Sequence, residues 1–161
     1  MNIRHLTHDD IPQVLRVQED AYKRELLECA EIFSRKLVLF PRGCLGHFED
    51  EWLEAYVFSH PWNLGQIVPL DHSLAALPES PDCLYIHDLA VCKDSRGTGL
   101  AERLVLEVFQ VAEQMRLWQF ALVAVQDSEP FWENWGFQRR EKLMYAENVL
   151  ATYMTLVRGR P

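Results

Sequence analysis

The hydrophobic positions in the first part of the chain recur at helical spacing. Residues 3–6 (IRHL) favour a short strand. Thr7 and Asp10 then have the spacing of a helix capping box, and Pro12 lies in the first turn. The apolar residues that follow fall on one helical face, and they are Ile11, Val14, Leu15, Ala21 and Tyr22. The pattern therefore predicts a strand followed by an amphipathic helix.

A second helix and a hairpin are expected next. Ser34 is a candidate cap for a short helix that ends before Pro41, which makes residues 7–40 a helical region. Two runs rich in apolar and β-prone residues, Cys44–Phe48 and Leu53–Phe58, flank an acidic turn. These two runs predict a pair of antiparallel strands.

The rest of the chain alternates between strands and helices after one long loop. Residues 60–82 contain four prolines, so they predict a surface loop rather than regular structure. The later elements are expected at Leu84–Val91, Gly99–Arg116 (helix), Phe120–Val125, Pro130–Trp135 (helix), Phe137–Tyr145 and Thr152–Val157. With neither an internal repeat nor a linker, residues 1–161 are expected to form one domain of mixed α/β class.

Composition and charge narrow the function classes. Of the 161 residues, 48% are hydrophobic and 25% are charged, as in ordinary globular proteins. The net charge of −8 opposes general binding to nucleic acid, which requires a basic surface. The start of the chain lacks an apolar signal region, and no run approaches the ~20 apolar residues of a membrane span. We therefore expect a cytoplasmic protein without nucleic-acid or membrane partners.

The cysteines and histidines do not form a recognisable ligand set. The cysteines are far apart and form no CxxC pair, and they are Cys29, Cys44, Cys83 and Cys92. This spacing predicts free thiols rather than disulfides or a zinc knuckle. The six histidines are scattered without the HExxH spacing, so no metal site is expected.

Residues 94–101 (DSRGTGLA) join a predicted strand to a predicted helix. The glycines allow close approach of the backbone, and a helix N-terminus presents unpaired N–H groups, so the segment suits a phosphate. No Lys-Ser/Thr pair follows the glycines and the spacing is not GxGxxG, which argues against a kinase or a dehydrogenase. Taken alone, the segment is equally a tight turn without a ligand.

Two further segments agree with one family. Residues 96–101 (RGTGLA) match the R/Q-x-x-G-x-G/A motif of the GNAT acetyltransferases, and they follow a strand that ends in Asp88–Val91 (DLAV), as in that family. Residues 130–137 (PFWENWGF) resemble the family's F-Y-E-x-x-G-F segment. By these motifs over residues 84–137, and by element order along the whole chain, the sequence resembles the GNAT superfamily.

This resemblance implies a fold and a cofactor. The fold is a central twisted mixed sheet of about six to seven strands, splayed between strands 4 and 5 and flanked by about four helices. Acetyl-CoA would place its pantetheine arm in the gap, on backbone groups of Leu89 and Val91, and its pyrophosphate on the amides of residues 96–101. The residues expected to contact it are Leu89, Ala90, Val91, Arg96, Gly97, Thr98, Gly99, Leu100, Ala101, Ser128, Phe131 and Trp132. A solvated arginine is the alternative for Arg96, and a helix cap is the alternative for Ser128.

Acetyl transfer to an alkyl amine requires proton removal, because an amine with a pKa of about 10.4 is mostly protonated at neutral pH. Strand alternation places Tyr85, His87, Leu89 and Val91 on one face and Ile86, Asp88 and Ala90 on the other. His87 is the first candidate base, with a structural core histidine as the alternative. The strand is similar to that of serotonin N-acetyltransferase, whose strand histidines assist through water. Asp88 is the second candidate base, or the partner that orients His87.

The acid that protonates the leaving thiolate is not assigned by the sequence. Many members of the family use a tyrosine, but this chain has Trp132 at that place in the F-Y-E segment. An indole N–H donates hydrogen bonds but is no useful acid. Tyr85, Tyr145 or water are the candidates that remain.

Several side chains are candidates for the acceptor site. Glu25, Glu28 and Glu31 lie in the region that lines this site in related folds and could attract an ammonium, although an exposed position is the simpler expectation for each. His60 and Trp62 either cover an acceptor pocket or anchor the long loop.

Three functions fit these observations. The leading hypothesis is an acetyl-CoA-dependent N-acetyltransferase that transfers acetyl directly to a small primary amine in a ternary complex. A protein N-terminus or lysine is the alternative acceptor, and it requires an open groove rather than a pocket closed by residues 60–82. A CoA-binding sensor without turnover is the third hypothesis, because Trp132 replaces the usual tyrosine. The resemblance is also compatible with a homodimer.

Overall fold

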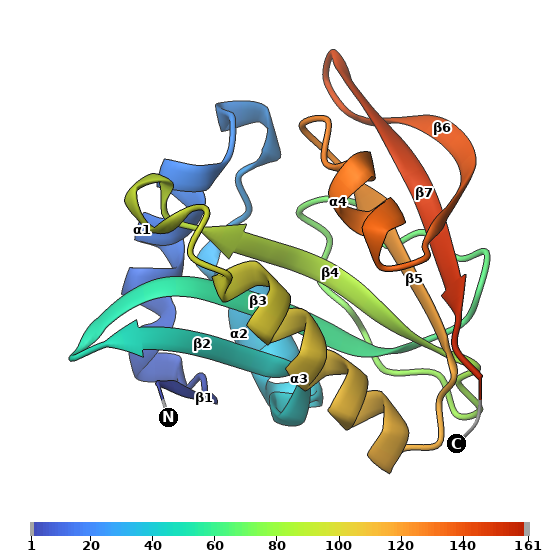
Figure 1. Ribbon diagram of the computed structural model, residues 1–161, viewed down its shortest axis with the longest axis horizontal. Coiled ribbons are helices and arrows are strands. Elements are labelled where there is room, and N and C mark those ends of the chain that lie inside the picture. The colour runs from blue at the N-terminus through green and yellow to red at the C-terminus, as the bar shows by residue number, and fades with distance from the viewer. Residues whose placement is uncertain (1, 160–161) are drawn as a thin grey trace.

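A computed structural model describes residues 2–159 as a seven-stranded sheet with helices on both faces (Figure 1). The strand order is β1-β2-β3-β4-β5-β7-β6, and only the β4–β5 pair is parallel. The strands are β1 (Ile3–His5), β2 (Cys44–Glu49), β3 (Trp52–Trp62), β4 (Cys83–Val91), β5 (Gln119–Ala124), β6 (Gln138–Ala146) and β7 (Val149–Val157). The helices are α1 (Ile11–Ala21), α2 (Ala30–Leu39), α3 (Leu100–Gln114) and α4 (Glu129–Asn134). The predicted fold class and splayed mixed sheet are confirmed.

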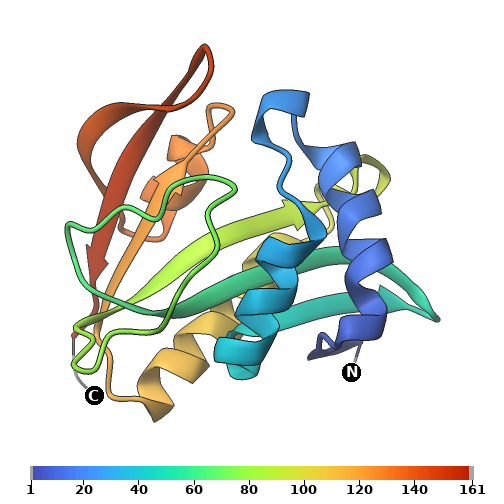
Figure 2. The ribbon, with the colours of Figure 1, turned by 180° about the vertical axis from the view of Figure 1, so that it is seen from behind.

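Two helical layers cover the sheet. Helices α1 and α2 lie on one face, while α3 and α4 lie on the other (Figures 1 and 2). Helix α3 buries one apolar stripe against the sheet, formed by Leu100, Leu104, Val105, Val108, Phe109, Val111 and Ala112. Helix α1 buries a similar stripe, including Val14 and Val17, against β3 and the aromatic side chains of Tyr56 and Phe58.

The N-terminal helices begin differently from one another. The capping box of Thr7 and Asp10 is confirmed, and Asp10 also binds the guanidinium of Arg4 at 2.8 Å. The expected cap at Ser34 is wrong, because α2 begins at Ala30 and Ser34 lies inside it. Between α1 and α2 the chain is not continuously helical, since a short 3₁₀ turn interrupts an extended connection.

Strand β3 is longer than the sequence predicted. The β2–β3 hairpin is confirmed, but β3 continues to Trp62 through His60 and Pro61, which pair with β4. The expected loop over residues 60–82 therefore starts too early, and the observed loop covers residues 63–82. The Trp62 indole donates to the Gln66 carbonyl at 2.8 Å, so this tryptophan anchors the loop.

Strands β4 and β5 separate after a short parallel contact. Leu84, Tyr85 and Ile86 pair with residues 120–122. Within the described part of the chain, the pairing of β4 with β5 ends at Ile86. Strand β4 nevertheless stays paired with β3 as far as Val91. The sheet consequently splays along the second half of β4, on the side that faces β5.

A β-bulge in β4 changes which side chains share a face. Phe58 pairs with Asp88 and the next residue, Ser59, pairs with Ile86, so His87 is an extra residue. Ile86 packs in the core under α3, as Leu89 does, whereas His87 and Asp88 both face α1 and α2. The predicted alternation, which placed His87 with Leu89 and Val91, is therefore wrong.

The cysteines are free thiols, as the sequence predicted. Cys44 and Cys83 are buried, Cys92 is half-buried and Cys29 is exposed, and all four are free. Within residues 2–159, no helix is long and apolar enough to cross a membrane.

Gly43→Ala tests how tightly the 3₁₀ turn before β2 (Pro41–Gly43) packs against β3. A Cβ at Gly43 would overlap the Ser59 carbonyl oxygen and contact the Phe40 ring. Overpacking of this kind costs about 1–3 kcal/mol, so the melting temperature should fall by roughly 3–10 °C. Gly159→Ala is the control, because a Cβ there meets nothing within 4 Å. Equal melting temperatures for the two variants would contradict the described packing.

Candidate active site

A cleft of about 310 Å³ lies where β4 and β5 separate. Its walls come from elements that are far apart in the sequence, which the splayed sheet brings together. The lining residues are Ala21, Tyr22, Leu26, Glu28, Leu70, Ile86, His87, Asp88, Leu89, Ala90, Val91, Arg96, Ala101, Leu122, Val123, Val125, Gln126, Ser128, Phe131, Trp132 and Tyr145. The cleft thus joins the phosphate-binding segment expected from the sequence to the candidate base on β4.

Backbone groups of β4 are available on one wall of the cleft. The Cys92 N–H donates to the Glu54 carbonyl, so at this end of the strand alternate residues turn toward β3. Leu89 and Val91 therefore direct their N–H and C=O groups away from β3, toward the gap. An extended ligand with amide groups can pair with them as a neighbouring strand would.

The turn before α3 presents backbone amides. Gly97 and Gly99 have φ angles of +75° and +83°, which favour glycine, and a Cβ at either position would meet nothing within 4 Å. Among residues 2–159, no side chain caps α3, so the first-turn amides stay open to an anion. Arg96 and Ala101 line the cleft, and the Arg96 guanidinium also donates to the Ala21 carbonyl at 3.4 Å.

Other residues of this segment have different positions. Thr98 donates its hydroxyl to the Ser95 carbonyl at 2.5 Å, which stabilises the turn. The Leu100 side chain is buried in the core under α3. Gly97, Thr98, Gly99 and Leu100 are not among the lining side chains, so any contact that they make with a phosphate involves the backbone.

The opposite wall is formed by the start of α4. Ser128 and Phe131 line the cleft, and the Trp132 indole is buried with 6% exposure, edge-on to Phe131 and Phe137. Ser128 occupies the N-cap position, but its side chain makes no capping bond to the part of the chain described. The expected capping role of this side chain is therefore wrong. Trp132 acts as an apolar wall.

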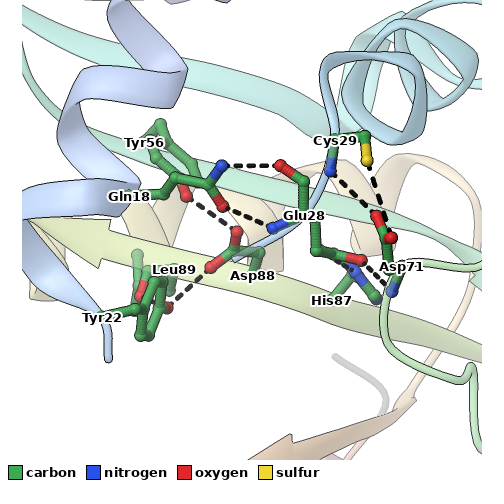
Figure 3. A network of polar contacts seen from close by, with 9 residues as sticks. All are labelled: Gln18, Tyr22, Glu28, Cys29, Tyr56, Asp71, His87, Asp88 and Leu89. Atoms are coloured by element: carbon green, nitrogen blue, oxygen red, sulfur yellow. Dashed lines mark hydrogen bonds and ion pairs between the residues drawn. The ribbon is translucent and has the colours of Figure 1, made fainter. Parts of the chain in front are cut away.

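His87 is paired with a buried glutamate (Figure 3). Its Nε2 lies 2.7 Å from Glu28 Oε1, and the two side chains are only 1% and 3% exposed. The second Glu28 oxygen accepts the Asp71 N–H at 2.8 Å, and the Gln18 side-chain amide makes reciprocal bonds with the Glu28 backbone. Burial acts to raise the pKa of Glu28, but the contacts with His87, Lys36 and Asp71 lower it overall. The expectation that Glu28 is exposed is wrong.

Asp88 is held by two tyrosines. Tyr22 Oη lies 2.6 Å from Asp88 Oδ1, and Tyr56 donates to Oδ2 at 2.8 Å (Figure 3). Burial, reinforced by the negative charge of Glu28, raises the pKa of Asp88 from 3.8 to about 6. This carboxyl can therefore change protonation state under mild conditions.

Buried cations and imidazoles lie behind the two carboxylates. Lys36 on α2 is 1% exposed, and burial lowers its pKa although Glu28 and Asp88 act to raise it. Burial also lowers the pKa of His60 to about 3, so this imidazole is neutral, and it stacks on the ring of Tyr85. His60 is thus a core residue of β3 rather than a lid over the cleft.

The two candidate tyrosines are placed differently. Tyr85 is fully buried under the loop of residues 63–82 and is not a lining residue of the cleft. Tyr145, from β6, lines the cleft. Burial, together with nearby Tyr85, Glu28 and Asp88, raises the pKa of Tyr145 well above its usual value, so its hydroxyl stays protonated.

The structure brings His87, Asp88 and eight of the twelve expected cofactor contacts into the lining of one cleft, and it adds residues that sequence reasoning missed. The missed groups are Tyr22, Lys36, Tyr56 and the ion-pair role of Glu28. The available signal was the four acidic residues between Asp20 and Glu31, with Tyr22 among them, and it gives no indication of burial.

Asp88→Asn should stabilise the protein at neutral pH. Because folding raises the pKa of Asp88, its proton stabilises the folded state below about pH 4, and this contribution is lost as pH rises through about 6. An amide of the same shape does not ionise, so the free energy of unfolding at pH 7.5 should increase by on the order of 2 kcal/mol. Urea unfolding at pH 4 and 7.5 measures this. The exposed control Asp9→Asn should show no such gain, and a variant destabilised at pH 7.5 would contradict the environment described.

Comparisons with known proteins agree with this geometry. The family described as "Acetyltransferase (GNAT) domain" matches residues 60–158. The loading GNATL domain of CurA from Lyngbya majuscula aligns with a TM-score of 0.82 and 12% identity over 97% of this chain and 96% of that one. The GNAT-like decarboxylase GphF, in complex with isobutyryl-CoA, gives 0.81 and 13% over 98% and 99%. Ard1 from Thermoplasma volcanium gives 0.77 and 15% over 98% and 97%.

These identities show a shared fold, and no curated protein sequence matches at a significant level. The family match rests on the sequence itself and covers more than half of the chain. It includes β4, the glycine turn, α3 and α4, which all contribute residues to the lining of the cleft. The protein belongs to the GNAT acetyltransferase family.

Proposed function

We propose that the protein is an acetyl-CoA-dependent N-acetyltransferase that acts on a small primary amine in a ternary complex. One observation carries this proposal: a single cleft has open backbone groups and an uncapped helix at one end and a buried His–Glu–Asp cluster at the other. This arrangement suits a long anionic cofactor that meets a cationic acceptor.

The residues present fit acetyl-CoA along the length of the cleft. Leu89 and Val91 offer backbone partners for the pantetheine amides, and the turn at residues 96–101 offers amides to the pyrophosphate. Phe131 and Trp132 form the apolar wall on the other side. When bound, acetyl-CoA supplies the thioester carbonyl that the amine attacks.

Glu28 and His87 remove the proton of the acceptor in this proposal. The Glu28 carboxylate draws an ammonium to this end of the cleft and holds His87 through Nε2. His87 Nδ1 is buried and has no hydrogen-bond partner among residues 2–159, so in this proposal a water bound between it and the acceptor amine carries the proton. Asp88, beside it on the bulge, adds negative charge to the same face.

In this proposal Tyr145 hydrogen-bonds the leaving thiolate, and water supplies its proton. Tyr145 lines the cleft and its hydroxyl stays protonated at neutral pH, so it is a hydrogen-bond donor, but its raised pKa opposes full proton transfer to a thiolate with a pKa of about 8.5. Tyr85 does not reach the cleft, and Trp132 has no acidic proton. The role of the usual family tyrosine beside the thiolate therefore falls to Tyr145 of β6 in this proposal.

The loop over the acceptor end favours a small acceptor. Asp71 of this loop donates its N–H to Glu28 and accepts the Cys29 N–H at 2.9 Å, while Leu70 lines the cleft. Arg35 of α2 donates to the Leu74 carbonyl at 2.8 Å (Figure 2 shows the loop). A loop fixed beside the cleft in this way limits the space for a long acceptor, and this supports a small molecule over a protein.

A free-thiol assay tests the function. The purified protein is mixed with acetyl-CoA and a panel of polyamines, arylalkylamines, amino acids and short peptides. We expect thiol release that depends on a small amine. Faster release with peptides would favour a protein acceptor, and CoA binding without release from any acceptor would favour the sensor hypothesis.

His87→Ala should lower kcat by about 10²-fold, the scale of general base catalysis, and leave the affinity for CoA unchanged. Single-turnover rates and calorimetric titration with CoA measure the two effects. The matched control is His8→Ala, because His8 is exposed and does not line the cleft. A loss of CoA affinity equal to the loss of kcat would assign His87 a structural role instead.

A further inference from the structure

The Tyr22 hydroxyl contacts two acceptors at once. Its oxygen lies 2.6 Å from Asp88 Oδ1 and 2.6 Å from the Leu89 carbonyl oxygen, while Tyr56 donates to Asp88 Oδ2 (Figure 3). A phenol carries only one hydrogen. Tyr22 can therefore donate to Asp88 or to Leu89, but not to both.

Counting hydrogens distinguishes the two protonation states of Asp88. If the carboxyl is ionised, Tyr22 donates to it, and the Tyr22 and Leu89 oxygens then face each other without a hydrogen between them. If Asp88 carries a proton on Oδ1, it donates to Tyr22 and Tyr22 donates to Leu89, so every oxygen in the chain is paired. The observed contacts therefore fit a protonated Asp88.

The surroundings of Asp88 allow either state. Titratable groups face it from the α1 end, the α1–α2 connection, α2, β3, β4 and β6, and they are Tyr22, Glu28, Lys36, Tyr56, His87 and Tyr145. Burial and the charge of Glu28 favour the protonated carboxyl, while the two tyrosines and His87 favour the ionised one. Because these effects oppose one another, the loss of a single hydrogen bond can shift the equilibrium.

The Leu89 carbonyl belongs to the cofactor wall as well. It points into the gap between β4 and β5, where the pantetheine arm lies in the proposed function on which this inference rests. A pantetheine amide N–H is a second donor for that carbonyl, and it satisfies the oxygen without the Tyr22 hydrogen. The Tyr22 hydrogen is then available to the carboxyl.

We propose that Tyr22 couples cofactor binding to the ionisation of Asp88. As the pantetheine amide bonds to Leu89, the Tyr22 hydrogen turns to Asp88 Oδ1, the O–H bond of the carboxyl breaks, and its proton leaves to solvent. No other bond changes. The carboxylate charge beside His87 thus develops only after the cofactor is in place, so a cationic amine binds second.

Calorimetric titration with dephospho-CoA tests the coupling. This ligand lacks the phosphate monoester, which itself titrates near pH 6, and its thiol stays protonated below pH 7. Titration at pH 6 in buffers of different ionisation enthalpy should show release of on the order of half a proton per ligand bound. The affinity should rise as pH increases from 5 to 7, because binding releases a proton.

Two tyrosine variants provide the matched comparison. Tyr22→Phe and Tyr56→Phe each remove one hydroxyl from Asp88, but only Tyr22 reaches Leu89. Tyr22→Phe should still bind dephospho-CoA with its proton release reduced to the background of the Asp88→Asn variant. Tyr56→Phe should keep the release with its maximum at higher pH, because a hydrogen bond that lowers the pKa of Asp88 is lost.

The outcomes separate this proposal from the proposed function. Binding of dephospho-CoA without proton release between pH 5 and 7 would overturn the coupling and leave the transferase intact. Equal release by wild type and Tyr22→Phe would also overturn it, because the proton would then come from another group. Failure of the folded wild-type protein to bind either CoA or dephospho-CoA would overturn both proposals.

Discussion

Strand β4 is hydrogen-bonded to β3 along its length but to β5 only from Leu84 to Ile86. A buried strand normally satisfies its backbone on both sides, so the second half of β4 keeps N–H and C=O groups that need partners. The structure turns these groups into a wall of the cleft rather than covering them. The open backbone groups of Leu89 and Val91 and the bulge at His87 lie along this half-strand, so the cleft and the acidic cluster beside it depend on the separation.

The bulge at His87 determines which side chains of β4 share a face. An extra residue places His87 and Asp88 on one face, although consecutive strand residues normally face opposite sides. Together with Glu28, the protein thus buries two carboxyls next to an imidazole and Lys36, an arrangement that is expensive to desolvate. Reciprocal pairing lowers this cost for Glu28, whereas Asp88 responds with a raised pKa. Active sites commonly lose folding stability in this way, because their chemistry requires charged groups away from water.

The features that sequence reasoning predicted correctly are those determined by local patterns. The stripe of α3 and the glycine turn are periodic or local signals, and both are confirmed. The bulge at His87 is set by pairing between β3 and β4, so strand alternation alone placed His87 and Asp88 on opposite faces, although they share one. Glu28 follows no periodic element, and its burial comes from His87 and Asp71, residues distant in the chain. Long-range packing of this kind leaves no pattern in a single sequence.

The two carboxyls are each held by a group that also belongs to a substrate side of the cleft. Glu28 accepts the backbone N–H of Asp71, which lies on the loop that covers the acceptor end. Asp88 contacts Tyr22, which also reaches the Leu89 carbonyl on the cofactor wall. Movement of the loop therefore changes the hydrogen bonding of Glu28, and occupation of the cofactor wall changes that of Asp88. Because Glu28 in turn raises the pKa of Asp88, a change in the hydrogen bonding of either carboxyl alters the charge of the cluster as a whole.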